Sequence, residues 1–224
     1  MVMDLPDGDT ASEDAGPDSP RWRRRKAFRS REVLDAALDA FVARGYAGTR
    51  LEDVARSAGV AKSTLYLYFA NKEDLFKAVV RDSIVPMIVE ASQIVDQWTG
   101  SSAALLAFLI EGWWERIGNL RSSGIMKLVT SEAGNFPGIA RFYLDEVITP
   151  GQAIFSRALQ RGIDHQEFSC PDVPATVHVI CSPVMMMALW EHTFAGVAER
   201  PASAERQLQA LITTLTRGLA TTPS

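Results

Sequence analysis

The sequence has few cysteines and no long apolar run, and each shortage narrows the class of protein. Its 224 residues include two cysteines, Cys170 and Cys181, too few for a disulfide framework, so we expect a reducing, cytoplasmic compartment. No stretch approaches the ~18 consecutive apolar residues of a membrane-spanning helix, so we expect no membrane partner. The N-terminus opens on acidic residues instead of a basic and then apolar signal, which predicts that the protein is not exported.

Residue sets for catalysis or metal binding are also missing. The sequence shows no Ser/His/Asp arrangement and no phosphate-binding glycine loop. His178 and Cys181 lie three apart, with His165 and Cys170 upstream, but this spacing does not match that of structural zinc sites. We therefore expect no catalytic residues, no metal and no cofactor. An all-helical enzyme with a basic surface stays as an alternative.

The net charge of −4 hides an uneven distribution along the chain. Residues 1–20 hold six acids and no base, residues 21–83 hold fourteen bases against eight acids, and residues 84–224 hold nine bases against thirteen acids. Charge asymmetry of this size indicates a polyanionic partner for the middle segment alone.

The first 31 residues divide into an acidic part and a basic part. Residues 1–20 are rich in Asp, Gly, Pro and Ser and are predicted to be a disordered acidic tail. Residues 21–31, RWRRRKAFRSR, carry seven positive charges and form either a solvated arm or a phosphate contact. We favour phosphate contact because the arm adjoins a candidate DNA-binding unit.

Apolar spacing from residue 31 onward predicts a series of short helices. The first ends at Gly45, as a glycine after a helix indicates. The run TRLE at residues 49–52 reads as a capping box in which Thr49 caps a second helix over about 50–58. A third helix covers about 62–69, and Asn71 caps a fourth.

Residues 50–69 fit a helix-turn-helix. Ala55 provides the small residue where the two helices cross, and Gly59 provides the turn. The apolar positions that pin the helices together are Val54, Ala58, Val60 and Leu65. The second helix of such a unit lies in the DNA major groove.

The segment Val33–Phe76 resembles the TetR family of bacterial transcriptional regulators, and its run TLYLYFANKEDLF is close to that family's pattern. Ala61 departs from the Ser or Thr that is frequent before this helix. The resemblance implies an all-α fold. A three-helix DNA-binding head, residues 21–83 with the arm, precedes a larger helical domain, residues 84–224, for effector binding and dimerisation.

The resemblance also implies DNA contacts around the third helix. Leu65 and Phe69 are four apart and share the core face, whereas Lys62 in the first turn is best placed for base edges. Tyr68 has an ambiguous position between core and DNA. The predicted DNA-binding residues are Thr49, Lys62, Ser63, Thr64, Tyr66, Leu67, Tyr68 and Lys72.

The C-terminal part is predicted to be helical throughout, with helices over 86–98, 102–118, 121–133, 138–162, 172–197 and 203–220. Its large apolar side chains belong either to ordinary core and dimer interface or to an apolar ligand pocket. The candidate pocket residues are Phe108, Trp113, Met126, Phe142, Met186 and Trp190.

The expected function is that of a sequence-specific transcriptional regulator. A homodimeric repressor on a palindromic operator, released by an unknown small apolar effector, follows from the resemblance, with dimerisation through the helices over 138–162 and 172–197. A ligand-independent regulator or an activator with the same head stays as the alternative.

Overall fold

The computed structural model describes residues 20–118, 123–199 and 202–221, and it describes side chains from residue 31 onward. The predicted acidic tail therefore lies outside the described residues, apart from Pro20. Within the described ranges the elements are helices, and a single antiparallel bridge joins Phe168 to Ala220. The all-α expectation is confirmed.

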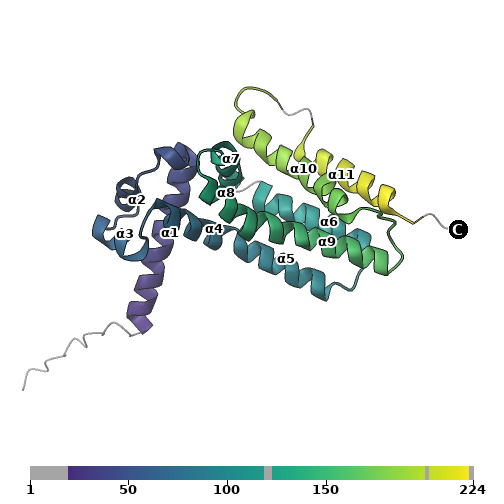
Figure 1. Ribbon diagram of the computed structural model, residues 1–224, viewed down its shortest axis with the longest axis horizontal. Helices are drawn as coiled ribbons and strands as arrows, with labels where there is room; N and C mark the ends of the chain where they lie inside the picture. Colours follow the sequence, from purple (N-terminus) through teal and green to yellow (C-terminus); the bar gives the residue numbers. More distant parts are fainter. Residues whose placement is uncertain (1–19, 119–122, 200–201, 222–224) are drawn as a thin grey trace, which may run out of the picture.

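The head lies at one end of the molecule (Figure 1). Its helices are α1 (Pro20–Gly48), α2 (Leu51–Ser57), α3 (Lys62–Tyr68) and α4 (Lys72–Ser83). The helical backbone of α1 begins eleven residues before the apolar pattern does, so the basic arm continues into this helix. Gly45 interrupts α1 with φ 72° and ψ 173°, a left-handed conformation that favours glycine, so the predicted break is confirmed.

Two of the predicted helix caps have different outcomes. The Asn71 side chain accepts a hydrogen bond from the Asp74 amide at 2.9 Å, which confirms the cap of α4. The capping box at Thr49 is wrong, because the N-cap of α2 is Arg50 and no side-chain bond caps it. Thr49 is instead buried, with its hydroxyl oxygen 2.7 Å from the Gly45 carbonyl oxygen at the break in α1.

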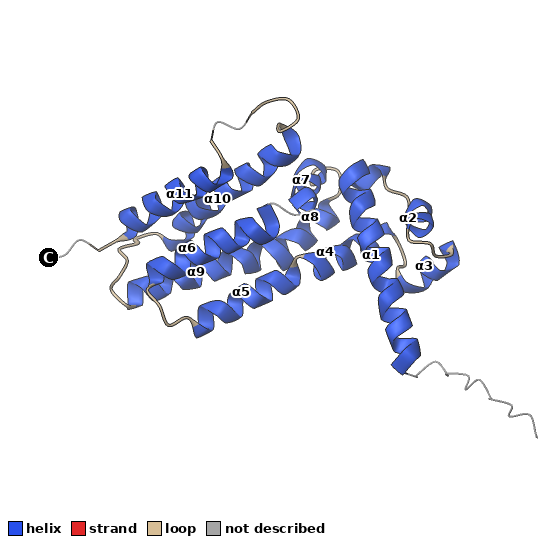
Figure 2. Cartoon of the chain, turned by 180° about the vertical axis from the view of Figure 1, so that it is seen from behind, coloured by secondary structure: helices blue, strands red, loops and turns tan. Residues whose placement is uncertain are grey.

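The remaining helices form a larger bundle beside the head (Figure 2). They are α5 (Val85–Gln97), α6 (Ser102–Trp113), α7 (Ser123–Glu132), α8 (Pro137–Tyr143), α9 (Thr149–Asp164), α10 (Val173–Thr193) and α11 (Ala204–Leu219). Two π-helical segments, η1 (Trp114–Gly118) and η2 (Leu144–Ile148), extend α6 and join α8 to α9. The predicted helical ranges are confirmed to within a few residues, but the π-segments are not apparent from the spacing.

A proline accounts for the position of η2. Pro150 has no amide hydrogen to donate to the carbonyl of residue 146, so a regular α-helix cannot run unchanged through this point. The wider turn of η2 ends at Ile148, and α9 begins with Pro150 in its first turn. The chain from α8 to α9 is therefore one helical path with a local change of pitch.

The buried apolar residues form two clusters. One fills the bundle between α5, α6, α9, α10 and α11. The other fills the head and includes residues of α7 and α8, such as Leu128 and Ile139. The helices α1 and α7 approach closely at Gly124, where a Cβ would lie 2.7 Å from a methyl group of Val42. The head is thus packed onto the bundle through a continuous apolar layer.

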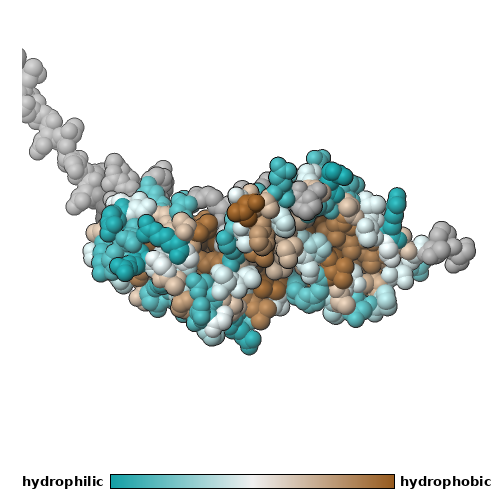
Figure 3. Space-filling model, turned by 90° about the horizontal axis from the view of Figure 1, so that it is seen from above, coloured by the Kyte–Doolittle hydropathy of each residue, from teal (hydrophilic) through white to brown (hydrophobic). Residues whose placement is uncertain are grey.

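The expectation that no segment is long and apolar enough to cross a membrane is wrong for α10. With 21 residues it meets the length and composition of a membrane-spanning helix, and 33% of its most apolar window is buried inside the protein. It packs on α7, α9 and α11, as a core helix does. Figure 3 shows hydrophobic side chains gathered on the side that α10 and α11 form.

Candidate functional site

The helix α3 divides into a core side and an open side. Leu65 is 1% exposed within the head core, and Phe69, which follows the helix, packs partly against the same cluster. Tyr66, Leu67 and Tyr68 are 44%, 82% and 43% exposed. The predicted division of the aromatic run is confirmed for its core side, and the open side presents two tyrosines and a leucine.

Lys62 is held in place at the start of α3. Its ammonium lies 2.6 Å from a carboxylate oxygen of Glu52 on α2 and 5.7 Å from the centre of the Tyr66 ring. The hydrogen bond from Lys62 is the main cause that lowers the pKa of Glu52, and the same bond raises the pKa of Lys62. The structure thus orients the Lys62 side chain over the exposed face of α3.

The Lys72 side chain makes contacts within the head that the sequence did not predict. Its ammonium donates to three backbone carbonyls at the end of α1, those of Tyr46 at 2.7 Å, Ala47 at 3.2 Å and Thr49 at 3.1 Å. It also lies 4.6 Å from the centre of the Tyr46 ring. Burial lowers the pKa of Lys72, and Glu132 partly offsets that effect. Lys72 therefore joins α4 to the broken end of α1 inside the head.

The predicted contact between the Thr49 side chain and DNA is wrong. This side chain is 1% exposed, and its hydroxyl is bonded to carbonyls of α1. Thr49 and Lys72 thus serve the same junction. The residues of the predicted DNA-binding set that retain an open or half-open position are Lys62, Ser63, Thr64, Tyr66, Leu67, Tyr68 and Lys72.

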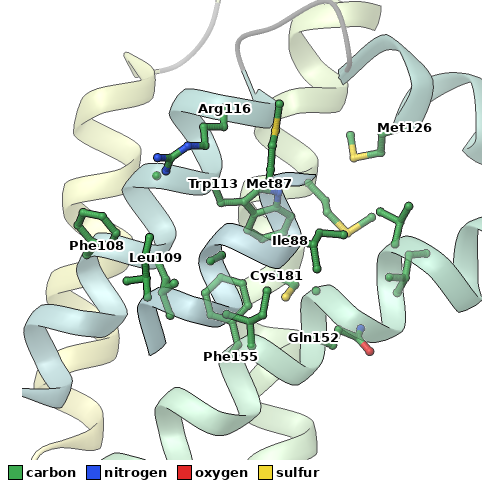
Figure 4. A pocket seen from close by; sticks show the side chains of 18 of the residues that line it. Met87, Ile88, Phe108, Leu109, Trp113, Arg116, Met126, Gln152, Phe155 and Cys181 are labelled. Atoms are coloured by element: carbon green, nitrogen blue, oxygen red, sulfur yellow. The ribbon is translucent and has the colours of Figure 1, made fainter. Parts of the chain in front are cut away.

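A cavity of about 140 Å³ lies in the bundle, walled mainly by α5, α6, α9 and the two π-segments (Figure 4). The rings of Trp113 and Phe155 meet there, with centres 5.7 Å apart. From η2, Val147 and Ile148 form part of the wall. Most lining side chains are apolar, as in small-molecule sites.

Three of the six predicted pocket residues line the cavity. Phe108, Trp113 and Met126 line it, as predicted. Phe142, Met186 and Trp190 do not. Phe142 packs in the head cluster, and Trp190 faces Phe194 near the end of α10. Met186 is 56% exposed, and its neighbour Met185 lines the cavity instead, because adjacent helical residues point about 100° apart.

Sequence reasoning missed several features of the cavity. Gly112 and Gly151 line it, as do residues of both π-segments, and no apolar periodicity marks them. Of the polar lining groups, burial raises the pKa of the Cys181 thiol to about 11 and raises that of the Tyr143 hydroxyl well above its usual range. Both groups are therefore protonated and neutral at pH 7.

His192 lies outside this cavity, at the end of α10. Its imidazole contacts the hydroxyl of Ser123, the first residue of α7, and Lys127 also donates to its backbone carbonyl. Burial is the main cause that lowers the pKa of His192. The contact joins α10 to the helix that packs on α1. Within residues 20–118, 123–199 and 202–221, no group of three His, Cys, Asp or Glu side chains could hold a metal ion.

Sequence comparison places the head among known DNA-binding domains. The family described as "Bacterial regulatory proteins, tetR family" matches residues 33–79. The HTH-type transcriptional regulator YfiR of Bacillus subtilis is 28% identical over 158 residues, 69% of this chain and 75% of YfiR. RutR of Escherichia coli K12 is 41% identical over 75 residues, which cover 34% of this chain and 30% of RutR. The second match thus spans less than half of either protein.

Solved structures share the fold over most of the chain. FadR of Bacillus subtilis, solved with stearoyl-CoA, has a TM-score of 0.69 at 19% identity, covering 84% of this chain and 98% of FadR. A regulator from Saccharomonospora viridis, solved with choline, has a TM-score of 0.72 at 18% identity, covering 88% of this chain and 100% of the other. The head of the chain, residues 33–79, thus matches the tetR family of bacterial regulatory proteins, and the chain as a whole shares the fold of these solved regulators.

Proposed function

We propose that the protein is a cytoplasmic, homodimeric repressor that binds a palindromic operator and leaves it when a small apolar molecule occupies the bundle cavity. The observation that carries the proposal is the place of η2, which lines the cavity and also contacts the helix α4 of the head. The named relatives are transcriptional regulators, and we propose no catalytic role for this chain.

The exposed face of α3 supports the DNA part of the proposal. Lys62 and Ser63 lie in the first turn, from which side chains reach base edges in the major groove. The hydroxyls of Tyr66 and Tyr68 suit phosphate oxygens, and Leu67 suits a thymine methyl. Thr64 is half-buried at the edge of the same face.

Footprinting on the DNA around the gene, with and without apolar candidate molecules, tests the proposal. A repressor should protect a palindromic DNA sequence, and this protection should disappear when the effector is added. Deletion of the repressor gene should raise the level of the target transcript. A transcript that falls on deletion would support the activator instead. Failure to retard any upstream fragment at low salt would favour the enzyme alternative.

The dimer is proposed to form through α10 and α11. The expected use of the helix over 138–162 loses support, because α9 packs on α5, α6 and α10. By contrast, α10 exposes Val179 at 58% and Met186 at 56%, and a second copy of the chain would cover these side chains. Sedimentation equilibrium at micromolar concentration should give the mass of two chains. A single-chain mass would argue against this interface.

The link between cavity and head is an ion pair. Arg81 of α4 donates through Nε to a carboxylate oxygen of Glu146 in η2 at 2.7 Å, and a second guanidinium nitrogen bonds the other oxygen. The Arg81 guanidinium also lies 5.1 Å from the centre of the Phe142 ring. Because Val147 and Ile148 line the cavity directly after Glu146, a ligand that displaces them would move the partner of α4.

Replacing Glu146 with Gln is expected to weaken the response to effector with little loss of stability. An exposed ion pair contributes about 1 kcal/mol at most to folding, so the free energy of unfolding should barely change. The factor by which effector lowers DNA affinity should shrink about threefold or more, since coupling of this kind is typically worth about 1–3 kcal/mol. Fluorescence anisotropy of labelled operator, titrated with and without effector, measures that factor.

Asp145 provides the matched control. It precedes Glu146 in η2 but pairs with Arg141 of α8, four residues earlier, at 3.5 Å. Asp145→Asn should therefore leave the coupling factor as it is. An equal loss in both variants, or none in Glu146→Gln, would show that the Arg81 pair does not transmit the signal.

A further inference from the structure

Arg116 brings a positive charge to the wall of the cavity. Among the described residues that line the cavity it carries the only formal charge at neutral pH. It belongs to η1, the π-segment that follows Trp113, and Figure 4 shows its guanidinium on the same side of the cavity as Phe108. A guanidinium beside apolar walls favours a ligand of negative charge.

The local backbone leaves room for this guanidinium. A Cβ at Gly112 would lie 3.0 Å from Nη1 of Arg116, so a larger residue there would push the guanidinium away from the wall. The absence of a side chain at Gly112 thus lets the Arg116 guanidinium approach the backbone of α6 four residues before its own. Gly112 is itself a lining residue, so this contact lies at the cavity.

Glu90 holds the other side of the guanidinium. Its carboxylate oxygen accepts from Nη2 of Arg116 at 2.9 Å, and the two side chains are 52% and 40% exposed. The pair therefore lies at the rim, between the cavity and solvent. A guanidinium has five N–H donors in a planar fork, so it can bind a second carboxylate beside Glu90.

We propose that the effector is a small carboxylic acid, whose carboxylate binds Arg116 and whose apolar part, about one ring in size, occupies the cavity. The inference rests on the proposed function, because it takes the cavity as the effector site. The volume of about 140 Å³ is close to the roughly 150 Å³ of a protein cavity that takes up benzene. Facing rings of Trp113 and Phe155 suit a planar guest.

The other polar side chains of the cavity wall are compatible with an anionic ligand. Cys181 and Tyr143 are neutral at pH 7, so neither repels a carboxylate. A cationic ligand would meet Arg116 first, and the aromatic rings would have to offset that repulsion. If the pair of Arg116 and Glu90 served only to join η1 to α5, the charge of the ligand would make no difference.

Three ligands of similar shape but different charge test whether the charge of the ligand matters. They are 3-phenylpropanoate, 3-phenylpropan-1-ol and 3-phenylpropylamine, titrated into the full chain by calorimetry at pH 7. The carboxylate should bind about tenfold or more tightly than the alcohol, because a charge-assisted bidentate contact is lost in the alcohol. The amine should bind most weakly. Equal affinities for acid and alcohol, or no binding of the acid at millimolar concentration, would overturn the proposal.

Substitutions then test whether Arg116 causes the preference for the acid over the alcohol. Arg116→Met should bring the affinity for the acid down to that for the alcohol, and Arg116→Lys should keep part of the preference. Glu90→Gln should raise the affinity for the acid, since it removes a competing acceptor. Arg141→Met, on the exposed side of α8, is the control and should leave the preference unchanged. A preference that survives in Arg116→Met would refute the assignment.

The two proposals fail in different ways. If the acid binds through Arg116 but operator DNA is retained, the anion site stands and the release mechanism is wrong. If acid, alcohol and amine all release DNA with equal affinity, the cavity is the effector site and the inference about its charge is wrong.

Discussion

Replacing Lys72 with Met should destabilise the head by about 2 kcal/mol and weaken binding to every DNA sequence, because hydrogen bonds from a charged group contribute about that much. The ammonium of Lys72 bonds the carbonyls of Tyr46, Ala47 and Thr49, in the segment that follows the break at Gly45. Met keeps the apolar stem and removes only the donor. Urea unfolding with intrinsic fluorescence gives the stability, and titration of labelled DNA gives the affinity.

Lys77→Met is the matched control for this variant. Lys77 lies on the same helix and pairs with Glu73 of the preceding turn at 2.7 Å, a contact worth about 0.5 kcal/mol or less. If Lys72 instead contacted only a DNA phosphate, the result would differ. Stability would then stay constant, and the slope of log affinity against log salt would fall by about one. That outcome would contradict the structural role.

The sequence was sufficient to predict the structural features that depend on one residue and its immediate neighbours. Gly45 ends the regular part of α1, and Asn71 caps α4, because each position needs a particular residue type whatever surrounds it. The contacts of Lys72 join residues 23 to 26 positions apart. No pattern within one helix reveals such a contact, so the sequence alone predicts only a DNA contact for Lys72.

The cavity wall was harder to predict because it depends on helix phase. Apolar spacing places α10 correctly, but it does not say which of Met185 and Met186 points inward, since both are apolar. The π-segments shift the phase once more, so residues after Leu144 face other directions than a regular helix would give. Gly112 and Gly151 offer no side chain that a periodicity count could use.

The same structure gives the reason why we expect effector coupling and folding stability to separate in this protein. The head and the bundle share buried apolar residues of α7 and α8, which hold the two together. The pair of Arg81 and Glu146 lies at the surface and contributes little to that cohesion. It does, however, connect one face of η2 with α4, while the other face lines the cavity. A weak contact at a junction can thus transmit a signal that the strong apolar layer does not.

Replacing Gly151 with Leu should abolish the response to effector and leave operator binding intact. Gly151 lines the cavity near the start of α9, and a Cβ there would meet no atom within 4 Å. A leucine side chain would therefore grow into the space that the ligand needs, and effector affinity should fall about 100-fold, as the apolar contacts of a ring-sized guest are lost. Helix propensity favours Leu over Gly by up to about 1 kcal/mol, so the fold should be at least as stable.

Ala153→Leu tests whether the location of the added side chain matters. Ala153 lies on the same helix but is exposed and does not line the cavity. This variant should keep the wild-type response, measured as operator release against effector concentration. A Gly151→Leu protein that binds operator and still releases it at the wild-type effector concentration would place the effector outside this cavity. A Gly151→Leu protein that no longer binds operator would show that filling the cavity itself mimics the ligand-bound state, since η2 would then be displaced without any effector.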